Sequence, residues 1–218
     1  MKTTMGQFLT VEGTEGVGKS TNMAFIEAQL RAAGIDLVVT REPGGTPLAE
    51  QLRGILLENR EEPFAPMAEL LTVFAARAQH IEQVIKPALL AGKWVLSDRF
   101  TDATFAYQGY GRGLSLSVIS QLENMVQNNF KPDTTFLLDI DVAVGLERAC
   151  ARGELDRFEH EQITFFEKVR SGYLERVKQN PARFCVVDAG QPLDAVQQDI
   201  HAQLTALLCT LPHAKKGQ

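Results

Sequence analysis

Several features that would mark a particular class of protein are scarce in this sequence. The three cysteines, Cys150, Cys185 and Cys209, are far apart and odd in number, so they form neither a disulfide framework nor a metal-ligand motif. No apolar run approaches the roughly 18 residues that indicate a transmembrane helix. The 22 basic and 27 acidic residues give a net charge of −5, whereas general binding of DNA or RNA needs a basic surface. Because the first residues also lack the apolar core of a signal peptide, we expect a cytoplasmic protein with neither a membrane nor a nucleic-acid partner.

Short apolar runs alternate with segments of helical periodicity along the whole chain. We expect strands at residues 7–12, 35–40, 94–97, 135–139 and 184–187, and helices at about 18–33, 47–58, 66–91, 115–128, 142–150, 160–179 and 192–207. Continuous runs of Val, Leu, Ile and Phe are typical of strands buried on both faces. With no visible linker or repeat, the pattern predicts one α/β domain over 1–218, with a five-stranded parallel sheet flanked by helices on both faces.

Four residues predict where helices begin and end. Thr46 followed by Pro47 is typical of an N-cap with proline at the first helical position. Gly34 and Gly92 are expected to close the helices that precede them. Pro87 lies inside the 66–91 pattern and should kink that helix or end it early, because proline has no N–H to donate.

The stretch 13–20, GTEGVGKS, matches the phosphate-loop pattern G-x-x-x-x-G-K-[ST]. It lies between the first expected strand and the first expected helix, where backbone N–H groups and a helix N-terminus can bind phosphates. Lys19 would reach the outer phosphates of ATP or GTP, and the Ser20 hydroxyl would ligate Mg²⁺. The residues expected to hold the nucleotide are Gly13, Thr14, Glu15, Gly16, Val17, Gly18, Lys19, Ser20 and Thr21. No Asn-Lys-x-Asp motif of a GTPase switch is present.

Two further strand ends carry residues suited to binding anions, and ligands of an open parallel sheet bind at such ends. Arg41 begins the turn 41–46 (REPGGT), and Asp98 and Arg99 follow the strand 94–97. Asp98 would hold water on Mg²⁺ and Arg99 would hold a phosphate, although the two could equally form a surface pair.

Arg77 lies on the apolar stripe of the helix 66–91, between Phe74 and Ile81. A guanidinium buried among apolar side chains needs an anion or a polar ligand, and a buried glutamate would serve equally well. Phe74 is either part of the core or a stacking platform for a base.

Arg148, Arg152 and Arg157 frame the segment of about 148–160. A solvated charged surface is the ordinary interpretation. The more specific interpretation is a lid that excludes water and brings guanidinium groups onto a transferring phosphate.

Taken together, these motifs resemble the thymidylate kinase family, whose members make dTDP from dTMP and ATP. The likeness covers nearly the whole chain, through 11–13, 41–46 with 48–50 and Arg53, 74–80 (FAARAQH), 98–99, 102–104, 107–109, 152–157 (RGELDR) and 188–190. It implies the P-loop NTPase fold of nucleoside monophosphate kinases, an acceptor-binding region of about 41–110, Mg²⁺ and a homodimer. Some family members carry an arginine in the phosphate loop; this chain has Glu15 there and arginines in the lid, which resembles the form typical of bacteria.

The resemblance also implies a role for each matching position. Lys19, Arg99, Arg148, Arg152 and Arg157 would be catalytic, and Ser20 and Asp98 would bind the metal. The adenine would lie beside Asp188, Ala189 and Gly190. The residues implied to bind dTMP are Glu12 near the deoxyribose hydroxyl or the metal waters, Arg41, Arg53 and Arg99 at the phosphate, Arg77, Thr104 and Gln108 at the thymine edge, Tyr107 near the deoxyribose, and Pro43 and Phe74.

Two positions depart from the family's pattern. Phe100 follows the Asp-Arg pair where Tyr or His is usual. Val73 occupies the usual place of the thymine-stacking phenylalanine, so we expect Phe74 to take over the stacking.

The expected reaction is in-line transfer of the γ-phosphoryl group to an acceptor phosphate that is already anionic, so no general base is required. Two alternatives have the same loop: a kinase for another nucleoside monophosphate or a nucleoside, and a non-catalytic nucleotide-binding switch.

Overall fold

The sheet has the architecture that the sequence predicts. The structure, a computed structural model, describes residues 5–151, 157–158 and 161–210. Its strands are β1 (Phe8–Glu12), β2 (Leu37–Arg41), β3 (Trp94–Asp98), β4 (Thr134–Asp139) and β5 (Phe184–Asp188). They form one five-stranded sheet in the order β2-β3-β1-β4-β5, and every neighbouring pair is parallel. All five carboxyl ends therefore meet at one edge, with β1 in the centre.

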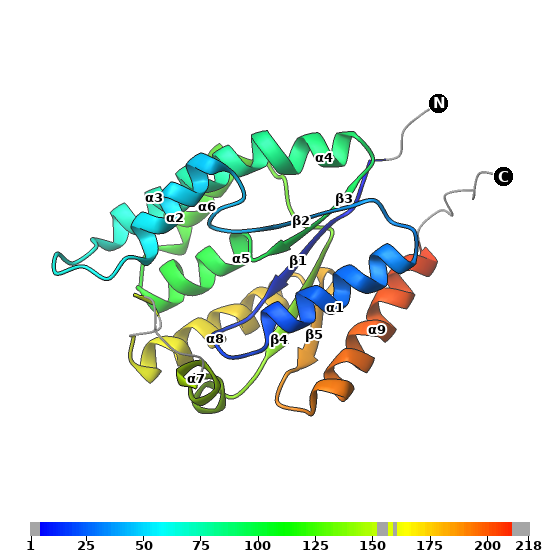
Figure 1. Cartoon of the computed structure of the whole chain (residues 1–218). Helices are drawn as coiled ribbons and strands as arrows, with labels where there is room; N and C mark the ends of the chain where they lie inside the picture. Colours follow the sequence, from blue (N-terminus) through cyan, green and yellow to red (C-terminus); the bar gives the residue numbers. More distant parts are fainter. Residues whose placement is uncertain (1–4, 152–156, 159–160, 211–218) are drawn as a thin grey trace.

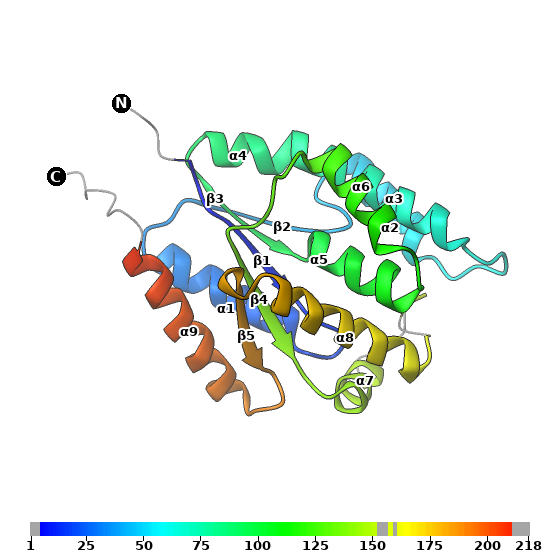
Figure 2. The same ribbon diagram turned by 180° about the vertical axis from the view of Figure 1, so that it is seen from behind.

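Helices cover both faces of the sheet. On one face, α1 (Lys19–Ala32) and α9 (Leu193–Thr210) pack on side chains such as Leu9 and Val11 of β1, and Figure 1 shows both in front. Side chains alternate along a strand, so Phe8 packs on the opposite face, against residues of the segment 81–89. The helix α8 (Ile163–Gln179) covers the β4–β5 half of that second face, which Figure 2 shows from behind.

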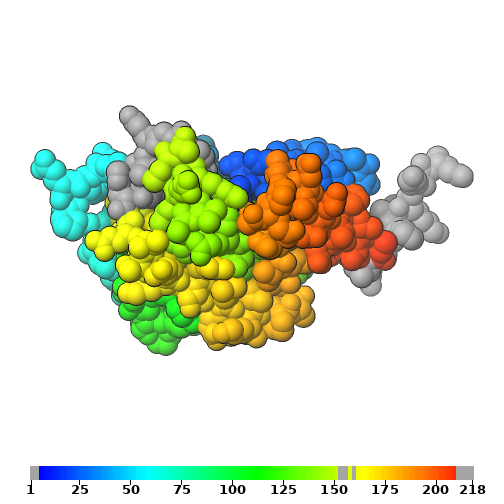
Figure 3. All heavy atoms as spheres, turned by 90° about the horizontal axis from the view of Figure 1, so that it is seen from below, coloured from blue at the N-terminus to red at the C-terminus, as the bar shows by residue number. Residues whose placement is uncertain are grey.

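Four further helices gather at the carboxyl edge and at one end of the molecule. They are α2 (Pro47–Leu57), α3 (Pro66–His80), α6 (Leu116–Gln127) and α7 (Val142–Cys150). Both ribbon views place α2, α3 and α6 side by side. Figure 3 shows the chain around residue 60 projecting at that end, opposite α9. In the described part of the chain, no helix combines the length and apolarity that crossing a membrane requires.

Three of the four predicted helix boundaries are confirmed. The Thr46 hydroxyl accepts a hydrogen bond from the Ala49 N–H at 3.1 Å and caps α2, while Gly34 and Gly92 follow their helices with φ of 80° and 79°. Of the two outcomes predicted for Pro87, a kink or an early end, the early end is wrong, and the regular α-helix is instead interrupted just before the proline. The helix passes through a π-helical turn, η1 (Ile81–Ile85), into α4 (Lys86–Leu90), because a widened turn relieves the need for the N–H that proline lacks.

The sequence interpretation missed one helical segment, α5 (Thr101–Thr104) followed by the π-helical η2 (Phe105–Gly111). Glycines and aromatic residues are poor helix formers, and this stretch is buried too completely to show an amphipathic period. Packing against α8 stabilises it, which is a tertiary contact that no local pattern reports.

Candidate active site

The phosphate loop has the backbone that its glycines permit. Gly16 and Gly18 have φ of 74° and 81°, a left-handed region that favours glycine. Gly18 caps α1 without a side-chain hydrogen bond, so the first N–H groups of α1 have no side-chain acceptor, which suits a phosphate. The Lys19 Nζ donates to the carbonyl oxygens of Gly13 at 3.2 Å and Thr14 at 3.0 Å. Burial, followed by the nearby charge of Arg99, lowers the pKa of Lys19.

Oxygen atoms suited to Mg²⁺ lie beside this loop. Asp98 pairs in register with Val11 at the end of β1, and its buried Oδ1 has no hydrogen-bond partner within the described residues. Ser20 is the second residue of α1 and is exposed. A carboxylate and a hydroxyl fit an ion that takes its other ligands from waters and phosphates. No group of three or more His, Cys, Asp or Glu side chains in the described ranges could hold a metal ion by itself.

Arg99 connects the end of β3 to the phosphate loop. Its backbone has a φ of 67°, a strained conformation that side-chain-bearing residues adopt mainly at functional sites. Its Nη2 donates to Glu15 Oε1 at 2.6 Å and to the Tyr107 hydroxyl at 2.8 Å. Burial alone would raise the pKa of the Glu15 carboxyl, but the charges of Arg99 and Lys19 lower it to about 2. Glu15 is therefore a carboxylate of the phosphate loop, and it also lines the neighbouring pocket.

That pocket is the large cavity among the described residues, with about 570 Å³ of space including its open mouth. An apolar wall with a few convergent polar groups is typical of a small-molecule site. Its lining residues are Glu15, Glu42, Pro43, Arg53, Leu56, Leu57, Val73, Arg77, Arg99, Phe100, Ala103, Thr104, Tyr107, Gln108 and Phe158. Seven predicted substrate-binding residues are thus brought together: Pro43, Arg53, Arg77, Arg99, Thr104, Tyr107 and Gln108.

Arg77 has the buried glutamate that the sequence left open as one partner, and within the described residues it keeps one donor free for the other. It is 2% exposed, and its Nε donates to Glu42 Oε2 at 2.7 Å, so a buried glutamate is present. Its Nη1 has no partner in the described part of the chain and remains a donor for a ligand. The rings of Phe74 and Phe100 each lie 5.1 Å from the guanidinium carbon, which favours the cation further.

Glu42 and His80 are functional candidates that the sequence interpretation missed. The fully buried His80 contacts Glu42 Oε1 through Nδ1 at 3.0 Å and the Thr40 hydroxyl through Nε2 at 2.7 Å. Glu42 thereby holds Arg77 and is held in turn by His80. The only available signal was that both residues lie inside the motifs 41–46 and 74–80.

Three predicted substrate-binding residues lie outside the pocket. Arg41 is half-exposed and pairs with Glu50 at 2.8 Å. Phe74 is 2% exposed and packs in a core cluster with Leu70, Phe105 and Ile119. Val73, one residue earlier, lines the pocket instead, because successive residues of a helix point about 100° apart.

Glu12 is the third, and it is fully buried. It accepts hydrogen bonds from the Phe100 N–H at 2.7 Å and the Tyr173 hydroxyl at 2.8 Å. Burial, together with the charge of Asp102, raises the pKa of Glu12 to about 8. Glu12 thus connects β1 to Phe100, just after β3, and to Tyr173 of α8. Of the two carboxylates, it is Glu15 in the phosphate loop that lines the pocket.

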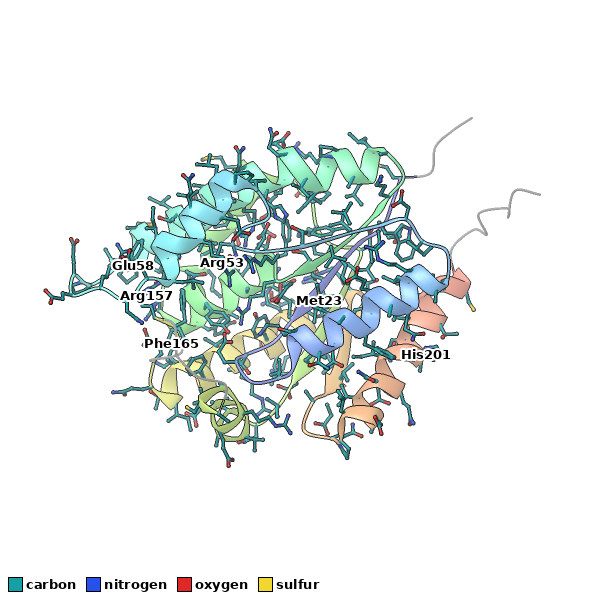
Figure 4. The ribbon with its side chains drawn as sticks, in the orientation of Figure 1. Met23, Arg53, Glu58, Arg157, Phe165 and His201 are labelled. Carbon is teal, nitrogen blue, oxygen red and sulfur yellow. The ribbon has the colours of Figure 1, made fainter. Side chains whose placement is uncertain are left out.

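The predicted lid arginines lie on two different sides of the site. Arg148 of α7 donates to the Ala189 carbonyl at 3.0 Å, in the loop after β5, where the Asp188 Oδ1 also accepts from the Gly190 N–H at 2.8 Å. Arg157 donates to the Leu56 carbonyl at 2.8 Å, and Figure 4 shows it beside Glu58, with Arg53 nearer the centre. Arg152 lies outside the described residues.

Comparisons with known proteins identify the family of this chain. The family model described as thymidylate kinase matches residues 11–200. The chain is 64% identical to a thymidylate kinase of Teredinibacter turnerae over 203 residues, 93% of this chain and 99% of that protein. It is 59% identical to one of Ectopseudomonas mendocina, covering 93% and 97% of the two chains. A solved thymidylate kinase structure from Ehrlichia chaffeensis matches with a TM-score of 0.75 at 33% identity, over 94% of this chain and 99% of that one. The chain belongs to the thymidylate kinase family.

Proposed function

We propose that this protein transfers the γ-phosphoryl group of ATP to the 5′-phosphate of dTMP, giving dTDP and ADP. The observation that carries the proposal is the position of the pocket directly beside the phosphate loop, with Glu15 and Arg99 at their common border. A phosphoryl transfer needs two anionic substrates held in line, and the two sites share this border. If the pocket lay far from the loop, its ligand could not receive the phosphoryl group, and a non-catalytic switch would be the better interpretation.

The acceptor phosphate would face the arginines on the loop side of the pocket. Arg53 and Arg99 line it. Burial lowers the pKa of Arg53, and the charge of Arg41, which lies outside the pocket, lowers it further. Such crowding of positive charge is costly without an anion and favourable with one. The base would lie at the far end, where Arg77 Nη1 and Thr104 Oγ1 are buried and unpartnered within the described ranges.

Catalysis would consist of positioning and charge neutralisation. Lys19 would move from the loop carbonyls to the outer phosphates of ATP, and Arg148 would hold the adenine-side loop 188–190. Ser20 and Asp98 would hold Mg²⁺, which when bound neutralises phosphate charge. Arg152 and Arg157, in the lid of about 148–160, would supply positive charge at the transferring group.

The protein would act in the cytoplasm, supplying dTTP synthesis, and as a homodimer. Support for the dimer comes from the adjoining helices α2, α3 and α6, which expose large apolar side chains: Leu48, Ile55, Met67, Leu71 and Met125. A cluster of this kind on neighbouring helices marks an interaction surface. Light scattering on the purified chain tests it, and a monomer at micromolar concentration contradicts it.

A panel of acceptors tests the reaction. ADP release with ATP and Mg²⁺ is measured with dTMP, dUMP, UMP, CMP and thymidine, and dTMP is expected to give the highest kcat/KM. Preference for another acceptor would identify a different kinase of the same fold. Slow turnover with every acceptor, with tight retention of the nucleotide, would indicate a non-catalytic switch.

A further inference from the structure

Glu69 is a fully buried carboxylate that does not line the pocket, yet it contacts a residue that does. It lies in the first turn of α3 and is 0% exposed. Its Oε1 accepts from the Gln108 Nε2 at 2.8 Å and from the Arg112 Nε at 3.3 Å, and its Oε2 accepts from the Arg157 Nη2 at 2.7 Å. All three partners donate to the Glu69 carboxylate, so it serves only as an acceptor in this arrangement.

An acceptor-only partner decides which way the Gln108 amide points. A glutamine side chain has an NH₂ donor and a carbonyl acceptor that differ little in shape, so their assignment follows from the hydrogen-bond network. Because a carboxylate can only accept, Gln108 must turn its NH₂ group toward Glu69. Gln108 also lines the pocket, and the amide atom left for a ligand is its carbonyl oxygen.

The base end of the pocket then offers an acceptor from Gln108 and a donor from Arg77 Nη1. This pair matches a base edge that carries an N–H beside a carbonyl oxygen, as thymine and uracil do. Cytosine presents a bare ring nitrogen and an amino group at the same positions, and it would leave both protein groups facing like groups. Buried polar groups left unpaired in this way discriminate strongly between ligands.

We propose that Glu69 is a positioning residue for base selection: by fixing the orientation of the Gln108 amide, it makes the pocket accept imide-edged pyrimidines and reject cytosine. The inference rests on the proposed function for its substrate, dTMP. The Arg157 contact adds a consequence, because the residue that orients Gln108 is also bonded to the lid segment. Gln108 and Arg157 therefore share one carboxylate.

The decisive variant is Glu69→Gln, which keeps the size but can donate or accept, so that the Gln108 amide is free to turn. We expect the ratio of kcat/KM for dTMP over dCMP to fall at least about tenfold, mainly through a higher KM for dTMP. The KM for ATP should stay within about twofold. Glu161→Gln is the matched control: it removes the other carboxylate partner of Arg112 (2.5 Å) and leaves the Glu69–Gln108 bond intact, so its ratio should equal that of the wild type.

Two further measurements separate positioning from a general loss of structure. In a Gln108→Leu background, Glu69→Gln should change the ratio no further, since both act through one amide; additive effects would overturn the proposal, as would an unchanged ratio in Glu69→Gln alone. If that variant does not fold, Glu69→Asp, which withdraws the carboxylate by one methylene, should lower the ratio instead. Calorimetric Kd values for dTMP and dCMP give the same ratio without turnover, so a failure of the proposed reaction, seen in the wild type, is distinguishable from a failure of Glu69.

Discussion

The phosphate loop and the acceptor pocket share a border, but they are built in different ways. The loop is one continuous stretch, 13–20, whose groups are mostly backbone and whose single basic side chain is Lys19. The pocket collects side chains from the turns that follow β2 and β3, from α2 and α3, and from the segment 101–111, with Glu15 of the loop and Phe158. A site made of backbone groups needs only the right local conformation. A site made of side chains from distant elements needs each side chain to be fixed in position by a neighbouring group.

The groups that hold the pocket's side chains are carboxylates from other elements, two of them buried and one, Glu15, partly buried. Glu42 holds Arg77, Glu69 holds Gln108, and Glu15 holds Arg99. The last pair also explains the low charge of the phosphate loop, because Arg99 Nη2 reaches to 3.4 Å from the Gly13 carbonyl. Arg99 therefore adds positive charge beside the phosphate loop. Glu15 of the loop, in turn, fixes the position of Arg99 at the pocket.

The largest effect is expected on the side of the phosphate loop, from Arg152→Ala. If this arginine meets the transferring phosphate, kcat should fall by about a hundredfold or more, while the Kd for dTMP changes little. Single-turnover kinetics and dTMP titration measure the two quantities separately. A weaker dTMP complex with unchanged kcat would place Arg152 with the pocket instead, and near-wild-type turnover would remove it from the mechanism.

On the pocket side, Glu42→Gln should cost about 3 kcal/mol of unfolding free energy, because it leaves the buried guanidinium of Arg77 without its counter-charge. Binding of dTMP should weaken as well, and ATP binding should not. Urea unfolding and calorimetry measure these changes. The control is Glu50→Gln, the same substitution in the exposed Arg41–Glu50 pair, which should cost less than about 1 kcal/mol. Equal losses would mean that the burial of Glu42 contributes nothing.

The same contrast explains how much the sequence could predict. The sheet, its flanking helices and the phosphate loop follow from local runs and a contiguous motif, and they are confirmed. Arg77 stood out because a charge interrupted an apolar stripe. Its partner Glu42 is 35 positions away, and Glu69 is 39 positions from Gln108. No spacing rule pairs residues at such separations, so the resemblance indicated which residues read the base but not what orients them.

Glu12 is a residue that the resemblance assigned to the ligand but that the structure places in the interior. Its motif suggested contact with the deoxyribose or the metal waters, but the end of β1 points it into the interior, against the Phe100 N–H and the Tyr173 hydroxyl. A strand residue faces one side or the other of a sheet, and the sequence of a strand buried on both faces does not say which side holds the ligand. Side-chain direction at strand ends is therefore the least predictable part of this site.

Glu12 is fully buried, and Glu12→Gln should change how stability depends on pH. The carboxyl ionises near pH 4.5 when unfolded and near 8 when folded, so between these values the folded state binds the extra proton and stability falls as pH rises. Glutamine copies the protonated acid and removes this fall, which can reach about 1.4 kcal/mol per pH unit. Urea unfolding from pH 5 to 8 should show the variant gaining on the wild type, and a constant difference would contradict the raised pKa.

The smallest effect tests whether the phosphate loop is as self-contained as its sequence suggests. Gly145 lies inside α7, and a Cβ there would come within 2.6 Å of the Glu15 carbonyl oxygen in the loop. Replacing a helical glycine by alanine ordinarily stabilises a helix by up to about 1 kcal/mol, but here it must displace the loop. Gly145→Ala should raise the KM for ATP about fivefold, a cost of ~1 kcal/mol, and leave the dTMP affinity unchanged. Gly54→Ala in α2 is the matched control, because an added Cβ there meets no atom within 4 Å. It should stabilise the protein and change neither the KM for ATP nor the affinity for dTMP. If Gly145→Ala behaves like Gly54→Ala, the phosphate loop keeps its conformation without close packing against α7. The loop would then depend on distant residues even less than the close approach of Gly145 to Glu15 indicates, and it would differ from the pocket more strongly.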